Sequence, residues 1–198
     1  MPKDKGVSLY QEQKLTKPLI EDLIPCFLDG DIKKSVFDLV AFMRSNKLKP
    51  SWCLTNAWKA VCKGKNICYI RFGAGSTYVK DVKLVITLYP LHIKTYEQTI
   101  FDEGLQNFLW KNVLHCIKKA EESCNNWGCA PGKTIAVCGK DITNICCNSN
   151  RQHFWFHDPD VSTINAIKRL IELEKKARYD LSKAPLQQQH ISAKEHHP

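Results

Sequence analysis

Apolar residues recur at helical spacing in three segments of the chain. Residues 29–50 carry them three or four positions apart, residues 99–124 repeat the pattern over a longer stretch, and a third stripe begins beyond Asp158. Aspartate caps helix N-termini, and the Pro159 that follows suits a first helical turn, so we expect the last helix to begin there. The spacing therefore predicts three helices, each with one apolar face.

Between the first two of these helices the apolar period falls to two. Residues 51–62 and 67–72 alternate around a glycine-containing turn, and residues 79–89 follow after the loop GAGSTY. Alternation over runs of this length predicts a β-hairpin and a third strand. Shorter extended pieces are expected at residues 134–138 and within residues 153–160.

A helix, three antiparallel strands, and then helices with short strands between them indicate an α+β domain. We expect a curved antiparallel sheet of about four to five strands, with helices packed on one face and the other face partly open. The domain is expected to span residues 19–181. Residues 1–18 are interpreted as a flexible N-terminal arm and the polar residues 182–198 as a flexible C-terminal tail.

The composition, with 43% hydrophobic and 25% charged residues, is ordinary for a soluble globular protein. No apolar run approaches the ~18 residues of a membrane span, and the polar first residues lack the apolar segment of a secretory signal. We therefore expect a cytoplasmic protein with no membrane association. The net charge of +9 permits binding to nucleic acid, but the lysines are scattered without a dense basic stripe. A solvated surface is the stronger interpretation of this charge, and nucleic acid is the less favoured partner.

Half of the ten cysteines lie between residues 124 and 148, in the stretch CNNWGCAPGKTIAVCGKDITNICCN. In a chain without an export signal, such cysteines are expected to be thiols or metal ligands. Zinc is the cofactor that the cluster suggests, because it takes four nitrogen or sulfur ligands, often from two close pairs. The candidate ligands are Cys124, Cys129, Cys146 and Cys147, with Cys138 or a nearby histidine in place of one of the adjacent pair.

Two other interpretations of the cysteines stay open. Free cysteine is a common buried residue, so these thiols are also interpretable as packing groups. Redox chemistry is the third interpretation, but Cys124 follows a predicted helix C-terminus, where the helix dipole raises a thiol pKa. The Gly-Lys-Thr of residues 132–134 is not a phosphate loop, because its glycines are too closely spaced and an extended run follows it instead of a helix.

Four residues of the predicted strands are candidates for a ligand site. In the simplest strand register, Trp58, Tyr69, Arg71 and Tyr89 meet on one concave face of the sheet. Aromatic walls with one charged group are typical of a small-molecule pocket. The alternative is that these rings form the core between sheet and helices. No nucleophile elbow, zinc-protease motif or paired carboxylates point to catalysis, so enzymatic activity is left open.

Three segments share their order and pattern with a known group of proteins. They are NAWKAVCKGKNICYIRF in the predicted hairpin, CAPGKTIAVCGK in the cysteine-rich stretch, and FHDPDVSTINAIKRLIELEKK at the last helix. Across residues 49–176 the chain resembles small uncharacterised bacterial α+β proteins of the YdhG-like type. The resemblance implies a curved sheet with helices on one side, and it supplies no catalytic residues.

Three functions of different classes are consistent with these patterns. The leading hypothesis is a cytosolic domain that binds a small molecule on its aromatic sheet face. The first alternative is a zinc-binding protein whose residues 124–147 are structured by the metal, and the second is a basic protein associated with nucleic acid. An open sheet face also suggests pairing with a second copy as a homodimer.

Overall fold

The computed structural model describes residues 8–74, 81–113, 115, 133–145 and 154–182, and within these ranges the fold is α+β. The helices are α1 (Leu9–Thr16), α2 (Ile20–Phe27), α3 (Gly30–Ser45), α4 (Glu97–Asp102), α5 (Gln106–Lys111) and α6 (Val161–Leu181), with a 3-10 turn η1 (Ile93–Tyr96). The strands are β1 (Ser51–Leu54), β2 (Ala57–Cys62), β3 (Lys65–Ala74), β4 (Val82–Leu88), β5 (Lys133–Val137), β6 (Lys140–Ile145) and β7 (Phe154–His157). None of the helices described here is both long enough and apolar enough to cross a bilayer.

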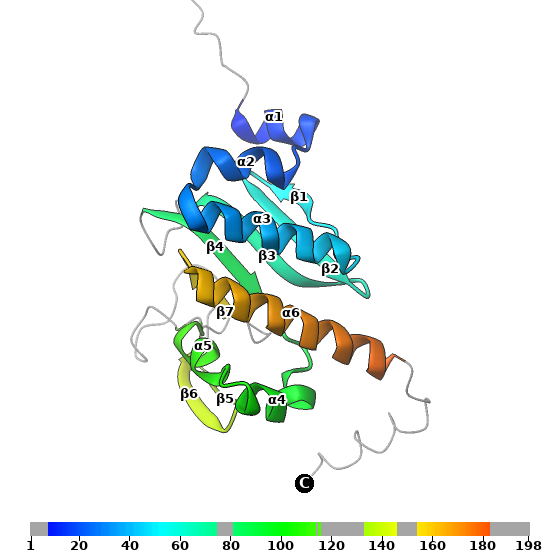
Figure 1. The fold of residues 1–198 in the computed structure, drawn as a ribbon, viewed down its shortest axis with the longest axis vertical. Helices are drawn as coiled ribbons and strands as arrows, with labels where there is room; N and C mark the ends of the chain where they lie inside the picture. Colours follow the sequence, from blue (N-terminus) through cyan, green and yellow to red (C-terminus); the bar gives the residue numbers. More distant parts are fainter. Residues whose placement is uncertain (1–7, 75–80, 114, 116–132, 146–153, 183–198) are drawn as a thin grey trace, which may run out of the picture.

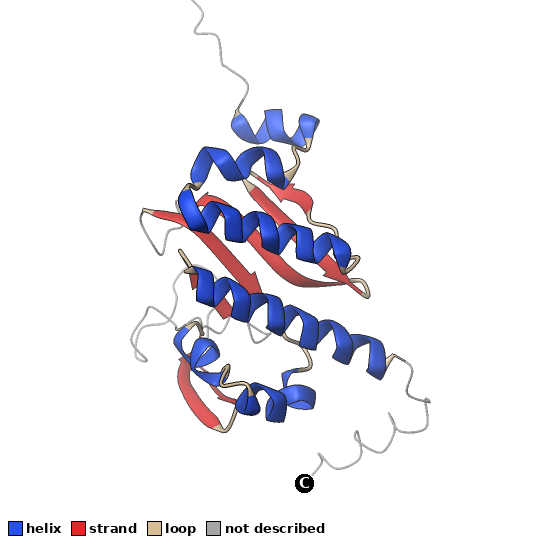
Figure 2. Cartoon of the chain, in the orientation of Figure 1, coloured by secondary structure: helices blue, strands red, loops and turns tan. Residues whose placement is uncertain are grey.

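Five strands form one antiparallel sheet in the order β1-β2-β3-β4-β7. The chain passes through α4, α5 and the β5–β6 hairpin before β7 returns to pair with β4 (Figure 1). Helices α2, α3 and α6 lie across one face of this sheet, with α3 and α6 side by side (Figure 2). The predicted antiparallel sheet with helices on one face is thus confirmed.

The single strand predicted over residues 51–62 is in fact two strands. The backbone turns at Asn56, whose φ of 52° lies in the left-handed region that asparagine tolerates. A second tight turn at Lys63 and Gly64, with φ of 52° and 74°, joins β2 to β3. Positive φ at both central residues is the geometry of a type I′ hairpin turn, whose twist matches that of the flanking strands.

A β-bulge in β3 decides which of its side chains face the helices. Next to the turn, Val61 pairs with Asn66. The preceding residue of β2, Ala60, pairs with Cys68, so Ile67 is the extra residue of the bulge. Because side chains alternate along a strand, this shift by one residue exchanges the two faces of β3 relative to β2.

The face of the sheet toward α3 and α6, which we call the inner face, forms the core with the helices. One cross-strand row on this face runs through all five strands. Its members are Trp52, Trp58, Ile70, Ile86 and Phe156. Phe156 and Ile70 are buried, and full burial of side chains of this kind contributes about 1.5–3 kcal/mol each.

Gly73 lets α2 approach β3 closely. Phe27 of α2 stacks on Phe72, with ring centroids 5.5 Å apart. The Phe27 ring also lies 2.7 Å from the position that a Cβ of residue 73 would occupy. The φ of Gly73 is +56°, a conformation that residues with a side chain rarely adopt. Glycine is therefore required at this position for two reasons: a side chain would collide with the Phe27 ring, and the backbone conformation disfavours other residues.

The predicted N-terminal arm contains a helix that is bound to the sheet. α1 begins with a capping box and carries the buried side chain of Gln13. Gln13 Nε2 donates to Asn56 Oδ1 at 2.7 Å, and Gln13 Oε1 accepts from the N–H of Asn56 at 2.8 Å. The flexible arm expected over residues 1–18 is therefore corrected for residues 8–18, which are fixed to the β1–β2 turn.

The helix predicted over residues 99–124 ends much earlier. α4 and α5 are separate short helices divided at Gly104, whose φ of 69° cannot continue a right-handed helix. Val113 then forms a β-bridge with Phe154 instead of a further helical turn. Most of the remainder, residues 116–124, lies outside the described residues.

α6 begins two residues later than the sequence predicts. Its N-cap is Asp160, whose side chain accepts a hydrogen bond from the N–H of Thr163 at 2.7 Å. Asp158 binds the sheet instead, because its Oδ1 accepts from the N–H groups of Lys83 and Leu84 at 3.0 and 2.8 Å. The Asp158 carboxylate thus fixes the start of β4 and leaves the helix cap to Asp160.

A buried ion pair fixes the C-terminal half of α6 to the sheet. Arg178 Nε donates to Glu174 Oε1 at 2.6 Å. The two terminal nitrogens of Arg178 donate at 2.9–3.1 Å to four main-chain carbonyls, those of Cys62, Lys65, Asn66 and Tyr89. Glu174 Oε2 accepts from the hydroxyl of Tyr96 at 2.9 Å and the N–H of His92 at 3.1 Å. The hydrogen bonds around both charges offset the cost of removing them from water.

Candidate functional site

The face of the sheet away from α3 and α6 carries polar and aromatic side chains. Residues directly opposite one another in one cross-strand row are Ser51, Lys59, Tyr69, Thr87 and Trp155. The next row contains Ala57, Arg71, Val85 and His157. We define these nine residues, together with the outward-facing Lys83 of β4, as the outer face. Directly opposed residues stand about 4.5–5.5 Å apart at Cβ, so each row is continuous.

No described helix packs on the outer face. The buried apolar residues of α2, α3 and α6 all belong to one core with the inner-face residues, whereas Val85 and Trp155 belong to a separate small cluster. Val85 and Thr87 of β4 are buried, whereas Lys59, Tyr69 and Arg71 are half-buried. The accessible centre of the outer face is therefore its β2–β3 part, which holds two cations and one ring.

The structure separates the four predicted ligand residues. Trp58 pairs with Ile70 and is 1% exposed on the inner face, whereas Tyr69 pairs with Lys59 on the outer face. The prediction that Trp58 and Tyr69 line one pocket is therefore wrong. The bulge at Ile67 is the cause, because in a regular ladder from the same turn Trp58 would stand opposite Tyr69.

The other two members of the predicted set differ in their roles. Arg71 does lie beside Tyr69, two positions along β3 and on the same face. Tyr89 follows β4 directly, where its N–H donates to the carbonyl of Ile67 and its own carbonyl accepts from Arg178. Tyr69 and Arg71 remain as the candidate pair, and the main chain of Tyr89 serves the fold.

The outer face is positively charged. Lys59, Arg71 and Lys83 point outward, and the described strands of the five-stranded sheet have no aspartate or glutamate at an outward position. Asp81 and Asp158 lie beyond the strand ends, and Asp158 is bound to the main chain of β4. Three cations on neighbouring strands without acids between them produce a positive potential over the face.

Arg71 is the one described arginine without a carboxylate partner. Arg44 pairs with Glu21, Arg169 with Glu103 and Glu172, and Arg178 with Glu174. An arginine presents five N–H donors in a planar fork that fits carboxylate and phosphate groups. Within the described part of the chain, Arg71 therefore makes no ion pair, and it lies next to an aromatic ring.

The remaining titratable groups of this region are uncharged at neutral pH. Burial raises the pKa of Tyr69, and the neighbouring Cys53 adds to the rise while Arg71 opposes it. Burial also raises the pKa of the Cys53 thiol, which Lys59 partly offsets. Partial burial lowers the pKa of His157 from its usual value, so its imidazole is neutral at neutral pH. The charge of the outer face thus comes from its lysines and its arginine.

Trp155 adds a second ring and an unused donor. It stands two strands from Tyr69 in the same row, with Thr87 between them. Its buried indole Nε1 has no hydrogen-bond partner, although an unmet buried donor costs about 1–3 kcal/mol. The row therefore has an aromatic side chain on each side of Thr87.

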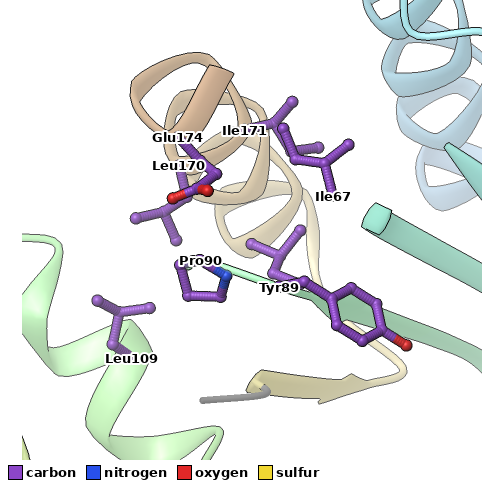
Figure 3. Close-up of a pocket in the computed structure, with 8 residues that line it drawn as sticks. Ile67, Tyr89, Pro90, Leu109, Leu170, Ile171 and Glu174 are labelled. Atoms are coloured by element: carbon purple, nitrogen blue, oxygen red, sulfur yellow. The ribbon is translucent and has the colours of Figure 1, made fainter. Parts of the chain in front are cut away.

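A cavity between α5, α6 and the end of β4 is too small for a ligand. Figure 3 shows Pro90, Leu109 and Leu170 around it, with the ring of Tyr89 directed away. Its free volume of about 10 Å³ is roughly that of one water molecule. Small-molecule sites are typically about 300–1,000 Å³, so this cavity is a packing defect next to Glu174.

The predicted zinc ligands Cys124, Cys129, Cys146 and Cys147 lie outside the described residues. Cys138, the alternative ligand, is buried in the β5–β6 turn. Burial raises the pKa of its thiol to about 11, with a further contribution from Glu97. Such a thiol stays protonated near neutral pH and serves packing. Among the residues that the structure describes, no three histidine, cysteine or acidic side chains form a metal-binding group.

No family model matches this chain, and comparisons with curated proteins and with solved structures gave no match. The resemblance to YdhG-like proteins therefore stays a prediction.

The sequence did not predict that Lys59, Lys83 and Trp155 share one sheet face with Tyr69. The alternation within residues 82–88 does place Lys83 and Thr87 on one side. Two further facts were needed: the bulge that sets the β2–β3 register, and the pairing of β7 with β4. No local sequence pattern predicts either the bulge or the pairing of β7 with β4.

Proposed function

We propose that this protein is a binding module whose outer face holds an anionic ligand that carries an aromatic ring. The observation behind the proposal is that Arg71, beside the half-buried ring of Tyr69, pairs with no carboxylate among the described residues. The guanidinium donates to a phosphate or carboxylate of the ligand, and the ligand ring stacks on the phenol. Lys59, opposite Tyr69, supplies a second cation within one strand spacing.

The comparison with the helical surface supports a binding role for Arg71. On α6, Arg169 is paired with Glu103 and Glu172, so an incoming anion would have to displace carboxylates from it. No described acid competes for Arg71. Hydrogen bonds to a charged group contribute about 1.5–3 kcal/mol, which is enough to make one such residue decisive for a weak ligand.

Three probes test the proposal: adenosine monophosphate, adenosine and inorganic phosphate. The nucleotide carries both ring and charge, and the other two carry one each. We expect amide NMR titrations to show the tightest binding for the nucleotide, with shifts centred on β2 and β3. Arg71→Met should weaken nucleotide binding by about tenfold, equivalent to ~1.4 kcal/mol.

The matched control is Arg169→Met, which removes the same side chain and the same charge from the helical surface. It should leave nucleotide affinity unchanged. Nucleotide-induced shifts that avoid the outer face, or equal losses in the two variants, would refute the proposal.

A further inference from the structure

We infer that the ligand of the outer face is a single-stranded nucleic acid, an inference that rests on the proposed function and narrows it. The three cations stand on three different strands, Lys59 on β2, Arg71 on β3 and Lys83 on β4. A compact anion reaches one or two of them. A chain of phosphates that crosses the strands reaches all three.

The spread of the cations favours a polymer. Lys59 stands opposite Tyr69, and Lys83 on β4 is level with residue 73 of β3, four positions further along. Two strand spacings of about 4.8 Å and four residues of about 3.3 Å each place the two lysines roughly 16 Å apart. One nucleotide with its phosphate covers only part of this distance, and Tyr69 offers a stacking position for one base of a longer strand.

The shape of the face also favours a strand over a small molecule. Small-molecule sites are concave and bury about 70–90% of their ligand. The outer face consists of strand residues, and the described helices α2, α3 and α6 pack on the inner face instead. Open antiparallel sheets with helices behind them suit nucleic-acid strands, whose unpaired bases stack on outward aromatic side chains.

A single strand fits better than a duplex. Duplex readout requires a helix or β-ribbon that enters a groove, and the described part of the outer face offers neither. Stacking on Tyr69 requires bases that are free of partners. The acid-free cations of the face and the net charge of +9 complement a phosphate backbone.

Fluorescence anisotropy with labelled oligothymidylate and oligouridylate, from the dinucleotide to the octanucleotide, tests the inference on the full chain. Affinity should rise with length and then level off when the strand spans the face. Each phosphate contact contributes about −0.7 to the slope of log affinity against log salt, so three cations predict a slope of about −2.

Two substitutions separate the contacts. Arg71→Met should reduce the magnitude of the slope by about 0.7, whereas the control Arg169→Met leaves it unchanged. Tyr69→Leu should weaken octanucleotide binding by about tenfold or more through lost stacking, and Tyr69→Phe should retain it. Retention in the phenylalanine variant shows that the ring is needed and that the fold is intact.

The outcomes distinguish this inference from the proposed function. Adenosine monophosphate that binds as tightly as the octanucleotide would overturn the polymer inference and leave the ring-and-anion site standing. Ring-free polyphosphate that competes as well as the octanucleotide at equal charge would overturn stacking. Failure of both nucleotide and oligonucleotide to bind would overturn the inference and the proposed function together.

Discussion

Arg178 and Arg71 lie on opposite sides of the same sheet and have opposite environments. Arg178 is buried, pairs with Glu174 and donates to four main-chain carbonyls. Arg71 is half-exposed on the outer face and has no described carboxylate within ion-pair distance. The described main chain and Glu174 occupy the donors of Arg178, whereas no described carboxylate occupies those of Arg71.

The difference shows how one side chain type serves two purposes in this molecule. Arg178 donates to main-chain carbonyls and so joins α6 to β2, β3 and the end of β4. Its substitution should therefore lower the free energy of unfolding. An arginine without a described ion-pair partner is expected to contribute little to stability, so its substitution should lower ligand affinity instead. Substitutions on the two sides of the sheet should therefore separate stability from affinity.

The largest effect is expected for Arg178→Met. The substitution leaves the Glu174 carboxylate buried without its partner, and breaking a buried pair in this way costs about 3–5 kcal/mol. Urea denaturation measures the loss. The double variant Glu174→Gln with Arg178→Met should recover part of it, because no charge is then left unpaired. A loss below about 1 kcal/mol in the single variant would show that the pair is not structural.

Gly73→Ala should come next, with a loss of about 1–3 kcal/mol from overpacking in addition to backbone strain. A methyl group at residue 73 meets the ring of Phe27, whereas one at Gly64 meets no atom within 4 Å. Both glycines have positive φ, so Gly64→Ala is the matched control for strain alone. Equal losses in the two variants would exclude the close approach of α2 as a cause.

Gln13→Ala should cost about 1–2 kcal/mol, because it removes the hydrogen bonds that the buried Gln13 side chain makes to Oδ1 and the N–H of Asn56. Hydrogen exchange should show faster opening of α1. Gln98→Ala, which removes an exposed amide, is the control. Unchanged protection of α1 in the Gln13 variant would show that residues 8–18 are held by other contacts.

Asp160→Ala should cost about 1 kcal/mol at neutral pH through loss of the α6 cap. The hydrogen bonds from Thr163 hold the pKa of Asp160 below its usual value. The stabilisation is therefore present above the unfolded pKa of about 3.9 and is lost as pH falls through the lower folded value. Unfolding curves should show the gap between wild type and variant closing in acid, and a gap independent of pH would contradict the cap.

The smallest stability change is expected for Arg71→Met, within about 0.5 kcal/mol, because the side chain is half-exposed and makes no described ion pair. Urea denaturation beside Arg178→Met gives the contrast directly. A loss comparable to that of Arg178→Met would mean that Arg71 is also structural.

The amino-acid sequence predicts the elements of this fold better than their contacts. Alternation places β3 and β4 correctly, and the apolar stripe of residues 161–171 identifies α6. The division at Gly104 and the turn at Asn56 are local backbone effects that the apolar pattern does not encode. Glu174 and Arg178 form a buried ion pair on α6. From the sequence alone, these two charged residues would be placed on the solvent-exposed side of the helix.

The candidate site was predictable only in part. Tyr69 and Arg71 share a face because they are two positions apart, which the sequence states directly. Whether Trp58 lies on the same face depends on one bulged residue, Ile67. The bulge shifts the β2–β3 register by one residue, which moves the side chains beyond it to the opposite face. Long-range pairing of β7 with β4 then brings Trp155 into the row, and no local signal specifies it.

The central claim is that Arg71, which pairs with no described carboxylate, holds an anion on the outer face. The most direct measurement is the dissociation constant for adenosine monophosphate of Arg71→Met and Arg169→Met, determined side by side. The account predicts about tenfold weaker binding for the first variant and wild-type binding for the second. Equal affinities in the two variants would contradict it.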